Sequence, residues 1–310
     1  MTVDIVLCAD RGAVLGLAAT VRSALEASTD TIDVHVLVTG VGPDEQEKLL
    51  RSWNHKRCGR VRFYELNADK LAHFRSTRYL KSKSSYARYF IAMLPSSVSR
   101  CIYLDTDLLV CRDLAEAGAL SLQGYPIAAV ADVSVRTRGE WPELRHRLGL
   151  RDERTYFNGG FLIIDLAAWR ALDIERKLVE LSIAAFDRLD SQDQDALNIV
   201  FEGQTLLLDP SWNTSQYENP STLSGRVVHL IGSAKPWHAL YLHRPENPDL
   251  NRRMYDSFYA VLDRTEYGGF RPWNPMGLGI LAETIKRNIP TADMVVGKLR
   301  RTFLRATKPS

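Results

Sequence analysis

The clearest chemical signal in the chain is a pair of aspartates at the end of an apolar run. In Cys101-Ile-Tyr-Leu-Asp105-Thr-Asp107, the two carboxylates are separated by one residue. In an extended backbone, residues two apart share a face, so both carboxylates can converge on one ion. Such oxygen ligands suit Mg²⁺ or Mn²⁺ held jointly with a ligand's phosphates. Because the same pattern also occurs as a polar turn that caps the next element, this run alone leaves both interpretations open.

A second cluster follows a short predicted strand, 226–229, that ends in an imidazole. His229 is a possible third ligand, Gly232 allows the backbone to approach a bound group, and Lys235 is a point charge suited to phosphate. Pro236 stiffens the turn that presents this lysine. An isolated histidine is usually a hydrogen-bonded core residue, but the nearby glycine and lysine favour a ligand role.

Two further motifs offer amides and backbone donors. Asn158, Gly159 and Gly160 precede a predicted strand, 161–164, and their pattern predicts a tight turn with free backbone N–H groups. The run 191–195, Ser-Gln-Asp-Gln-Asp, opens a predicted helix. An N-cap serine and acids in the first turn explain much of that run, but its amides and carboxylates equally suit sugar hydroxyls.

Other site classes find no support in the sequence. It contains neither a Gly-x-Ser-x-Gly elbow nor an HExxH pair, so serine hydrolase and zinc protease chemistry is excluded. It also has no GxGxxG or GxxxxGK[ST] phosphate loop. What remains is a dicarboxylate at a strand end, a distant histidine, a lysine and several amides. Together they suggest a metal-bridged diphosphate that is attached to a sugar.

An α/β layer must position these groups. Over the first hundred residues, strand patterns (3–7, 34–38, 61–64 and 100–104) alternate with helical patterns (15–27, 43–53 and 84–93). This alternation predicts a parallel sheet covered by helices on both faces. Such sheets place their sites beyond the carboxyl ends of the strands, which directs attention to Asp10 and Asp105.

Beyond Asp107 the pattern becomes mixed. Strands are predicted at 127–130 and 161–164, and one or two helices over 167–185. The Arg-rich segment 133–155, helical in part, and the loop-like segment 209–226 are expected to frame the site. Their aromatic residues, Trp141, Trp212 and Tyr217, are candidate platforms for sugar stacking, although such residues equally serve as small hydrophobic anchors.

The amino-acid composition limits the classes of protein to which the chain can belong. The 310 residues are 45% apolar and 25% charged, as in an ordinary globular chain, and the net charge of +3 excludes a nucleic-acid coat. The four cysteines lack CxxC spacing and are expected to be reduced thiols: Cys8, Cys58, Cys101 and Cys111. No signal peptide or membrane span is readable, so a cytoplasmic location is expected.

The charge is concentrated at one end. Residues 284–310 contain seven basic residues and one acid, a local charge of +6, and the remaining residues sum to −3. We therefore expect a catalytic domain over 1–270 and a basic, helical extension over 271–310. If 292–305 is helical, it is amphipathic and suited to an anionic membrane surface. A solvated helix packed on the body and a disordered end remain the alternatives.

Four motifs make the chain resemble a known family. In order, YLDTD, YFNGGFLIIDLAAW, SQDQDALN and HLIGSAKPWH look like the retaining glycosyltransferases of family 8, over about residues 3–238. That family includes bacterial lipopolysaccharide galactosyl- and glucosyltransferases and, more distantly, glycogenin. The resemblance implies the GT-A fold, a Rossmann-like and mostly parallel sheet flanked by helices. It also implies a UDP-sugar donor and Mn²⁺, or Mg²⁺ in its place.

The resemblance assigns roles residue by residue. The implied metal ligands are Asp105, Asp107 and His229. The implied donor site consists of those three residues and Ala9, Asp10, Arg88, Thr106, Asp132, Asn158, Gly159, Asp193, Gln194, Gly232 and Lys235. Asp10 would meet the uracil, and Lys235 with Gly232 the diphosphate. The donor sugar would be surrounded by Arg88, Asn158 and the three residues assigned to catalysis, Gln194, Asp193 and Asp132. The three residues after Asp10 differ from the Asp-Asn-Tyr of many bacterial members, so the aromatic and amide contacts of those members are missing there.

The leading hypothesis is transfer of glucose or galactose from UDP-glucose or UDP-galactose to a hydroxyl of a saccharide, lipid-linked glycan or glycoprotein, with retention of configuration. A metal and Lys235 would stabilise the departing diphosphate. Retention requires either a covalent intermediate, with Gln194 or Asp193 as nucleophile, or same-face attack. Because an amide is a poor nucleophile, same-face attack is favoured. The alternatives are a nucleotidyltransferase on sugar phosphates, which normally has a Gly-rich phosphate loop, and a non-catalytic nucleotide-sugar-binding homologue.

Overall fold

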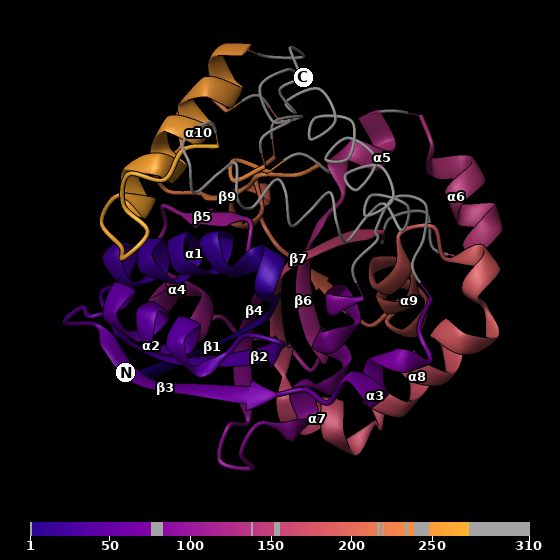
Figure 1. The fold of residues 1–310 in the computed structure, drawn as a ribbon. Coiled ribbons are helices and arrows are strands. Elements are labelled where there is room, and N and C mark those ends of the chain that lie inside the picture. Colours follow the sequence, from indigo (N-terminus) through magenta and orange to yellow (C-terminus); the bar gives the residue numbers. More distant parts are fainter. Residues whose placement is uncertain are drawn as a thin grey trace, which may run out of the picture.

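A seven-stranded mixed sheet forms the framework of the protein in the computed structural model. The structure describes residues 2–75, 83–137, 139–151, 156–215, 218, 220–232, 235–238 and 248–272. The strands are β1 (Thr2–Asp10), β2 (Thr31–Thr39), β3 (Cys58–Glu65), β4 (Arg100–Leu104), β6 (Ile127–Ala131), β7 (Phe157–Asp165) and β8 (Thr205–Leu207). Their order across the sheet is β3-β2-β1-β4-β7-β6-β8 (Figure 1).

Only one strand of this sheet runs against the others. The pairs β1–β2, β1–β4, β2–β3 and β6–β8 are parallel, whereas β7 is antiparallel to both β4 and β6. The prediction of a mostly parallel sheet is therefore confirmed. The carboxyl ends of β1 and β4 lie side by side, and the amino end of β7 meets them there.

Helices cover both faces of the sheet, as predicted. The α-helices are α1 (Val14–Ala27), α2 (Pro43–Ser52), α3 (Ala68–Ala72), α4 (Leu114–Ala119), α5 (Val133–Thr137), α6 (Trp141–Leu148), α7 (Leu166–Ala171), α8 (Ile174–Ala184), α9 (Gln192–Val200) and α10 (Pro248–Leu262). The short 3₁₀ segments are η1 (Arg11–Ala13), η2 (Ser84–Met93), η3 (Phe186–Arg188) and η4 (Pro210–Trp212). The predicted segments 84–93 and 167–185 become η2, which is 3₁₀ and not α, and the pair α7 and α8.

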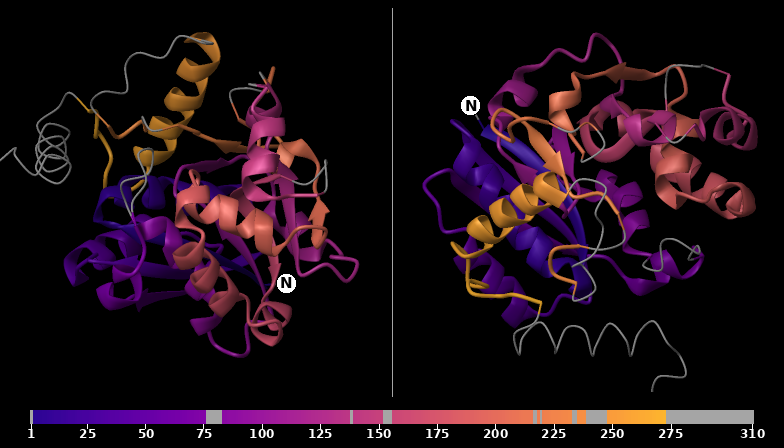
Figure 2. Two further views of the ribbon diagram at one scale, coloured as in Figure 1. Left: turned by 90° about the vertical axis from the view of Figure 1, so that its right-hand side faces the viewer. Right: turned by 90° about the horizontal axis from the view of Figure 1, so that it is seen from above.

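Alternation along β1 divides the core in two. Ile5 and Leu7 pack with α1, α4 and α10 in one cluster, whereas Val6 and Cys8 pack with η2 and α7–α9 in the other. Successive side chains of a strand point to opposite faces, so one apolar run supplies both clusters. Helix α10 contacts α1 on the first face and crosses it obliquely (Figure 1), and Figure 2 shows two further views.

A second, two-stranded sheet builds the edge where the chemistry lies. The strands β5 (Leu108–Val110) and β9 (Val227–His229) pair antiparallel, with Leu108 opposite His229. Helix α1 anchors β5, because Thr20 Oγ1 donates to Leu108 O at 2.7 Å. The sequence predicts β9 and misses β5, whose three residues follow the aspartate pair.

The predicted domain boundary and the predicted C-terminal extension fall where the described residues end. Phe270 still belongs to the first core cluster, and the described residues end at 272. The division at 271 therefore stays a prediction, and the basic segment 284–310 lies outside the described residues. Within the described residues, no helix has the length and apolar content needed to cross a membrane. The four cysteines are free thiols, as expected.

Candidate metal and donor site

A tight turn between β4 and β5 holds the two aspartates. Both flanking strands are buried, so the turn has little freedom. The N–H of Asp105 donates to Gly160 O at 2.8 Å, and the N–H of Leu230 donates to Asp107 O at 3.0 Å. The carboxylates converge as predicted, but from this turn and not from one face of an extended strand.

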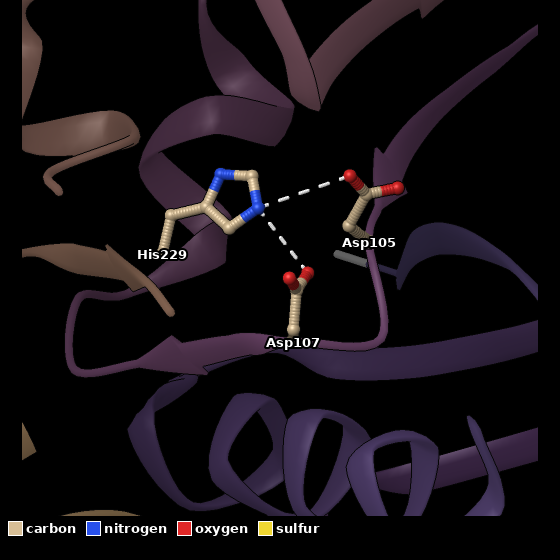
Figure 3. Close-up of side chains that lie close together, drawn as sticks. All are labelled: Asp105, Asp107 and His229. Atoms are coloured by element: carbon tan, nitrogen blue, oxygen red, sulfur yellow. Dashed lines mark ion pairs between the residues drawn. The ribbon is translucent and has the colours of Figure 1, made fainter. Parts of the chain in front are cut away.

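The pairing of β5 with β9 brings His229 to this turn. Nε2 of His229 lies 3.2 Å from Oδ1 of Asp107 and 3.9 Å from Oδ2 of Asp105 (Figure 3). Each of the three residues offers a ligand atom, and these atoms lie within 4.8 Å of one another. Two carboxylates and an imidazole are a donor set that fits a divalent cation such as Mn²⁺, with coordination positions left for phosphate oxygens.

Lys235 places an ammonium next to these carboxylates. Its Nζ forms an ion pair with Oδ2 of Asp107 and donates to Leu230 O at 2.9 Å. Burial opposes ionisation of Asp107, but Lys235 and His229 outweigh it and hold the pKa of this carboxyl well below its usual range. Asp107 is therefore ionised at neutral pH, which is the form that a cation binds.

Two residues hold the His229 ring in place. A Cβ placed on Gly160 would lie 2.3 Å from Cε1 of His229, so only glycine leaves room for the ring against β7. In addition, Nδ1 of His229 lies 2.9 Å from Oδ1 of Asn213. The ring is buried, and its Nε2 is the nitrogen that faces the two aspartates.

Arg88 forms the second charged centre of the site. Its guanidinium contacts Asp105 at 2.7 Å, Asp193 at 2.8 Å and the carbonyl oxygen of Gly159 at 2.7 Å. It also lies over the ring of Tyr103, whose hydroxyl donates to Asp105 Oδ1 at 2.7 Å. Burial alone would lower the pKa of Arg88, but the two carboxylates raise it well above its usual value. The guanidinium thus ties β4, β7 and α9 together.

Asp132 forms the third charged centre of the site, and its carboxylate accepts several hydrogen bonds. Its Oδ1 accepts from the backbone N–H and the hydroxyl of Ser134. Its Oδ2 accepts from the side-chain amides of Gln194 at 3.0 Å and Asn158 at 3.3 Å. Because both amides point their NH₂ groups at one carboxylate, the orientation of each is fixed, and the cluster presents ordered polar groups of the kind that bind hydroxyls.

Comparison with known proteins decides the family. Residues 4–240 match the profile described as glycosyl transferase family 8. The chain belongs to glycosyltransferase family 8.

Individual proteins are also similar to this chain. General stress protein A of Bacillus subtilis (strain 168) is 30% identical over 266 residues, which cover 79% of this chain and 85% of that protein. Lipopolysaccharide glucosyltransferase WaaO of Escherichia coli (strain K12) is 26% identical over 252 residues, with coverage of 77% and 73%. The crystal structure of the galactosyltransferase LgtC, in complex with donor and acceptor sugar analogues, matches with a TM-score of 0.69 and 26% identity, covering 82% of this chain and 95% of that one. The predicted GT-A fold is thereby confirmed.

The remaining predicted donor residues of this family 8 chain lie at the same edge of the sheet. Ala9 and Asp10 end β1, where they pair with Val38 and Thr39 of β2, and Asp10 accepts a hydrogen bond from Gly12 N–H at 2.8 Å. Thr106 is the middle residue of the aspartate turn. Gly232 follows β9 with φ of 116°, a conformation that strains any residue with a side chain.

One local prediction is wrong. Asn158, Gly159 and Gly160 belong to β7 and do not form a turn before it. Their N–H groups are not free either, since that of Gly159 donates to Gln194 Oε1 at 3.0 Å and that of Gly160 to Asn158 Oδ1 at 2.9 Å. The register of β6 against β7 shifts between Ala129 and Val130, which lets the strand continue while these donors bond side chains.

The predicted acceptor aromatics have different outcomes. Trp212 is 2% exposed, stacks on Phe161 at 5.4 Å and lies under Arg112. It is a core residue, so its prediction as a sugar platform is wrong. Trp141 is half-buried beside Tyr156, where its role stays a prediction, and Tyr217 lies outside the described residues.

Sequence reasoning misses three residues that shape the site. Tyr103 supports Asp105, and its position two residues earlier on β4 is a spacing signal that could have found it. Tyr156 donates to Asp195 at 2.6 Å and accepts from Gln194 at 3.1 Å. Asn213 lies in a segment predicted as an acceptor loop, and no spacing links it to His229.

Proposed function

We propose that the protein transfers a hexose, glucose or galactose, from a UDP-sugar to an acceptor hydroxyl with retention of configuration. The observation that carries this proposal is the convergence of Asp105, Asp107 and His229, with Lys235 beside them, at the carboxyl edge of a GT-A sheet. A bound Mn²⁺ or Mg²⁺ would supply Lewis-acid stabilisation of the charge that develops on the leaving diphosphate.

In this proposal, different residues of the chain bind the diphosphate, the nucleoside and the sugar of the donor. Lys235, with the backbone at Gly232, serves the diphosphate. Ala9, Asp10 and Thr106 line the nucleoside side. The sugar hydroxyls meet the ordered groups around Asp132 and Arg88, which are Asn158, Gly159, Asp193 and Gln194. Each assignment matches a group whose donors or acceptors suit that part of the ligand.

The contacts of the two candidate nucleophiles support same-face attack. Both ends of the Gln194 amide are already bonded, the NH₂ to Asp132 and Tyr156 and the oxygen to Gly159 N–H. The carboxylate of Asp193 is buried against Arg88. A covalent intermediate would have to break one of these arrangements, whereas attack by the acceptor on the face that the diphosphate leaves requires neither.

For the acceptor of the transferred hexose, we propose a chemical class and not a specific molecule. WaaO, whose name describes a lipopolysaccharide glucosyltransferase, is among the relatives, so we propose a saccharide carried on a glycolipid. The basic segment 284–310 supports a peripheral position on the inner face of the membrane. Deletion of 284–310 should abolish co-sedimentation with anionic vesicles, and retained binding would overturn this location.

The direct test is UDP release from a panel of UDP-sugars with Mn²⁺, with pyrophosphate followed in parallel. Turnover of UDP-glucose or UDP-galactose is expected, and Asp107→Ala should abolish it because a ligand is lost. Asp187→Ala, which changes an exposed aspartate on η3, is the matched control and should remain active. Pyrophosphate chemistry without UDP release would indicate a nucleotidyltransferase, and donor binding without turnover would indicate a non-catalytic homologue.

A further inference from the structure

A buried asparagine that no predicted role includes lies behind the candidate metal ligand His229. Asn213 is 5% exposed and ends the 3₁₀ segment η4. Its neighbour Thr214 is bonded to β9 on both sides, since the N–H of Thr214 donates to Val227 O at 2.8 Å and that of His229 to Thr214 O at 2.7 Å. The buried Trp212 fixes the other end of the segment. The backbone thus holds Asn213 beside the imidazole.

The orientation of the Asn213 amide follows from two hydrogen bonds that meet at Asn158, one of them from the backbone N–H of Gly160. The N–H of Gly160 donates to Oδ1 of Asn158 at 2.9 Å, which identifies that atom as the oxygen. Nδ2 of Asn213 donates to the same oxygen at 2.8 Å. With the Asn213 amide reversed, two oxygens would face each other at that distance. Oδ1 of Asn213 must therefore face His229.

This orientation determines where the proton of His229 lies. Oδ1 of Asn213 can only accept, so Nδ1 of His229, 2.9 Å away, must donate to it. When a cation occupies the site, Nε2 then carries the lone pair that faces it. That nitrogen faces Asp107 at 3.2 Å, where the lone pair is directed into the candidate metal site.

The same chain of bonds continues to the proposed sugar side. Nδ2 of Asn158 donates to Oδ2 of Asp132 at 3.3 Å, and Gln194 donates to that oxygen at 3.0 Å. Asn213 is therefore bonded on one side to a candidate metal ligand and, through Asn158, on the other side to the cluster around Asp132.

We propose that Asn213 is a positioning residue that holds His229 as the Nδ1–H tautomer and links the metal ligands to the hydroxyl-binding cluster around Asp132. This inference rests on the proposed function for the identity of the metal and the donor. The tautomer itself does not depend on either. Outer partners that orient a metal-bound histidine typically change metal affinity by about 10–100-fold when they are removed.

The first test is the tautomer in the metal-free protein, read from long-range ¹H–¹⁵N NMR spectra of the His229 ring. The wild type should show Nδ1–H, and Asn213→Ala should shift the ring toward Nε2–H or a mixture. A wild-type ring without a proton on Nδ1, or an unchanged Nδ1–H ring in Asn213→Ala, would overturn the proposal.

The second test is Mn²⁺ affinity in the presence of UDP, measured by electron paramagnetic resonance. Asn213→Ala should weaken it by about 10–100-fold. Asn213→Asp can still accept from Nδ1–H but cannot donate to Asn158. It should keep Mn²⁺ affinity near that of the wild type and raise KM for the donor sugar. Equal Mn²⁺ affinity of the wild type and Asn213→Ala contradicts the positioning role, whereas a wild type that binds no Mn²⁺ contradicts the proposed function instead.

A matched control separates positioning from lost stability. His35 is fully buried and bonded to Asp4 at 2.8 Å and Tyr64 at 2.9 Å, all within β1–β3. His35→Asn should lower the melting temperature without changing Mn²⁺ affinity. If His35→Asn weakened Mn²⁺ binding as much as Asn213→Ala does, general destabilisation would explain both, and the proposal would fail.

Discussion

Two corners of the site use carboxylates in different ways, and Asp105 belongs to both. At the Arg88 corner, Oδ1 of Asp105 and the carboxylate of Asp193 bond a buried guanidinium, which also bonds Gly159 O. At the His229 corner, Oδ2 of Asp105 faces the imidazole and Asp107. The first corner carries its own central cation. In the second, three ligand atoms converge, and Lys235 pairs with only one of the two aspartates.

The difference indicates what each corner is for. A buried guanidinium between carboxylates is a structural centre, because removing it leaves buried negative charge without compensation. The His229 corner, with its ionised Asp107 and the lone pair that we infer on Nε2, offers a donor set that fits a cation from outside the chain. Changes at the Arg88 corner should therefore lower stability in addition to any effect on donor binding, whereas changes at the His229 corner should act mainly on activity.

Replacing Arg88 should give the largest effect. Arg88→Met leaves Asp105 and Asp193 without their partner, so the free energy of unfolding should fall by about 3–5 kcal/mol. Urea unfolding followed by circular dichroism measures it. Arg264→Met is the control, because its ion pair with Glu26 is partly exposed and worth at most about 1 kcal/mol. Equal effects of the two variants would remove the distinction between the corners.

Replacing Asp107 should affect turnover more than stability. Asp107→Asn loses one carboxylate ligand but keeps the shape of the turn, and turnover of the UDP-sugar should fall by about 10²–10³-fold. Steady-state UDP release, measured beside urea unfolding of the same variant, separates the two effects. The comparison fails if this variant loses as much unfolding free energy as Arg88→Met.

A smaller effect is expected when the His229 ring is displaced. The Cβ of Gly160→Ala would clash with the ring, and Mn²⁺ affinity should weaken by about tenfold. Calorimetric titration with Mn²⁺ and UDP measures this change. Gly42→Ala is the control, since nothing lies near a Cβ there and its φ of −70° is allowed for alanine. Unchanged affinity in Gly160→Ala would show that the ring position is not critical.

The smallest effect concerns acid stability without metal. The pKa of Asp107 is held below its ordinary value of 3.8 in the folded protein, so its contribution is present above that pH and is lost as the pH falls below it. Asp107→Asn cannot titrate and should therefore lose less stability between pH 6 and about pH 3. Urea unfolding with a chelator tests the sign, and an equal or larger acid loss in the variant contradicts it.

The sequence predicts which candidate ligands come together better than it predicts the residues that hold them in place. Asp105, Asp107 and His229 have distinctive residue types at strand ends, and local patterns locate those strands. Arg88 is assigned only by resemblance, and its bonds to β4, β7 and α9 depend on how three distant segments pack. Asn213 is 16 residues from His229 in the sequence and meets it through the pairing beside β9, which no periodicity encodes. The glycines in β7 are predicted to form a turn because glycine favours turns in the local sequence. The register shift between β6 and β7 that keeps them in the strand depends on tertiary pairing, which the local sequence does not encode.

The central claim is that the His229 corner binds a divalent cation together with the nucleotide. Electron paramagnetic resonance of free Mn²⁺, titrated with the protein in the presence and absence of UDP, tests it most directly. The wild type should bind one Mn²⁺ per chain, more tightly with UDP, and Asp107→Asn should lose this binding. Absence of Mn²⁺ binding by the wild type with UDP, or equal binding by Asp107→Asn, would contradict the account.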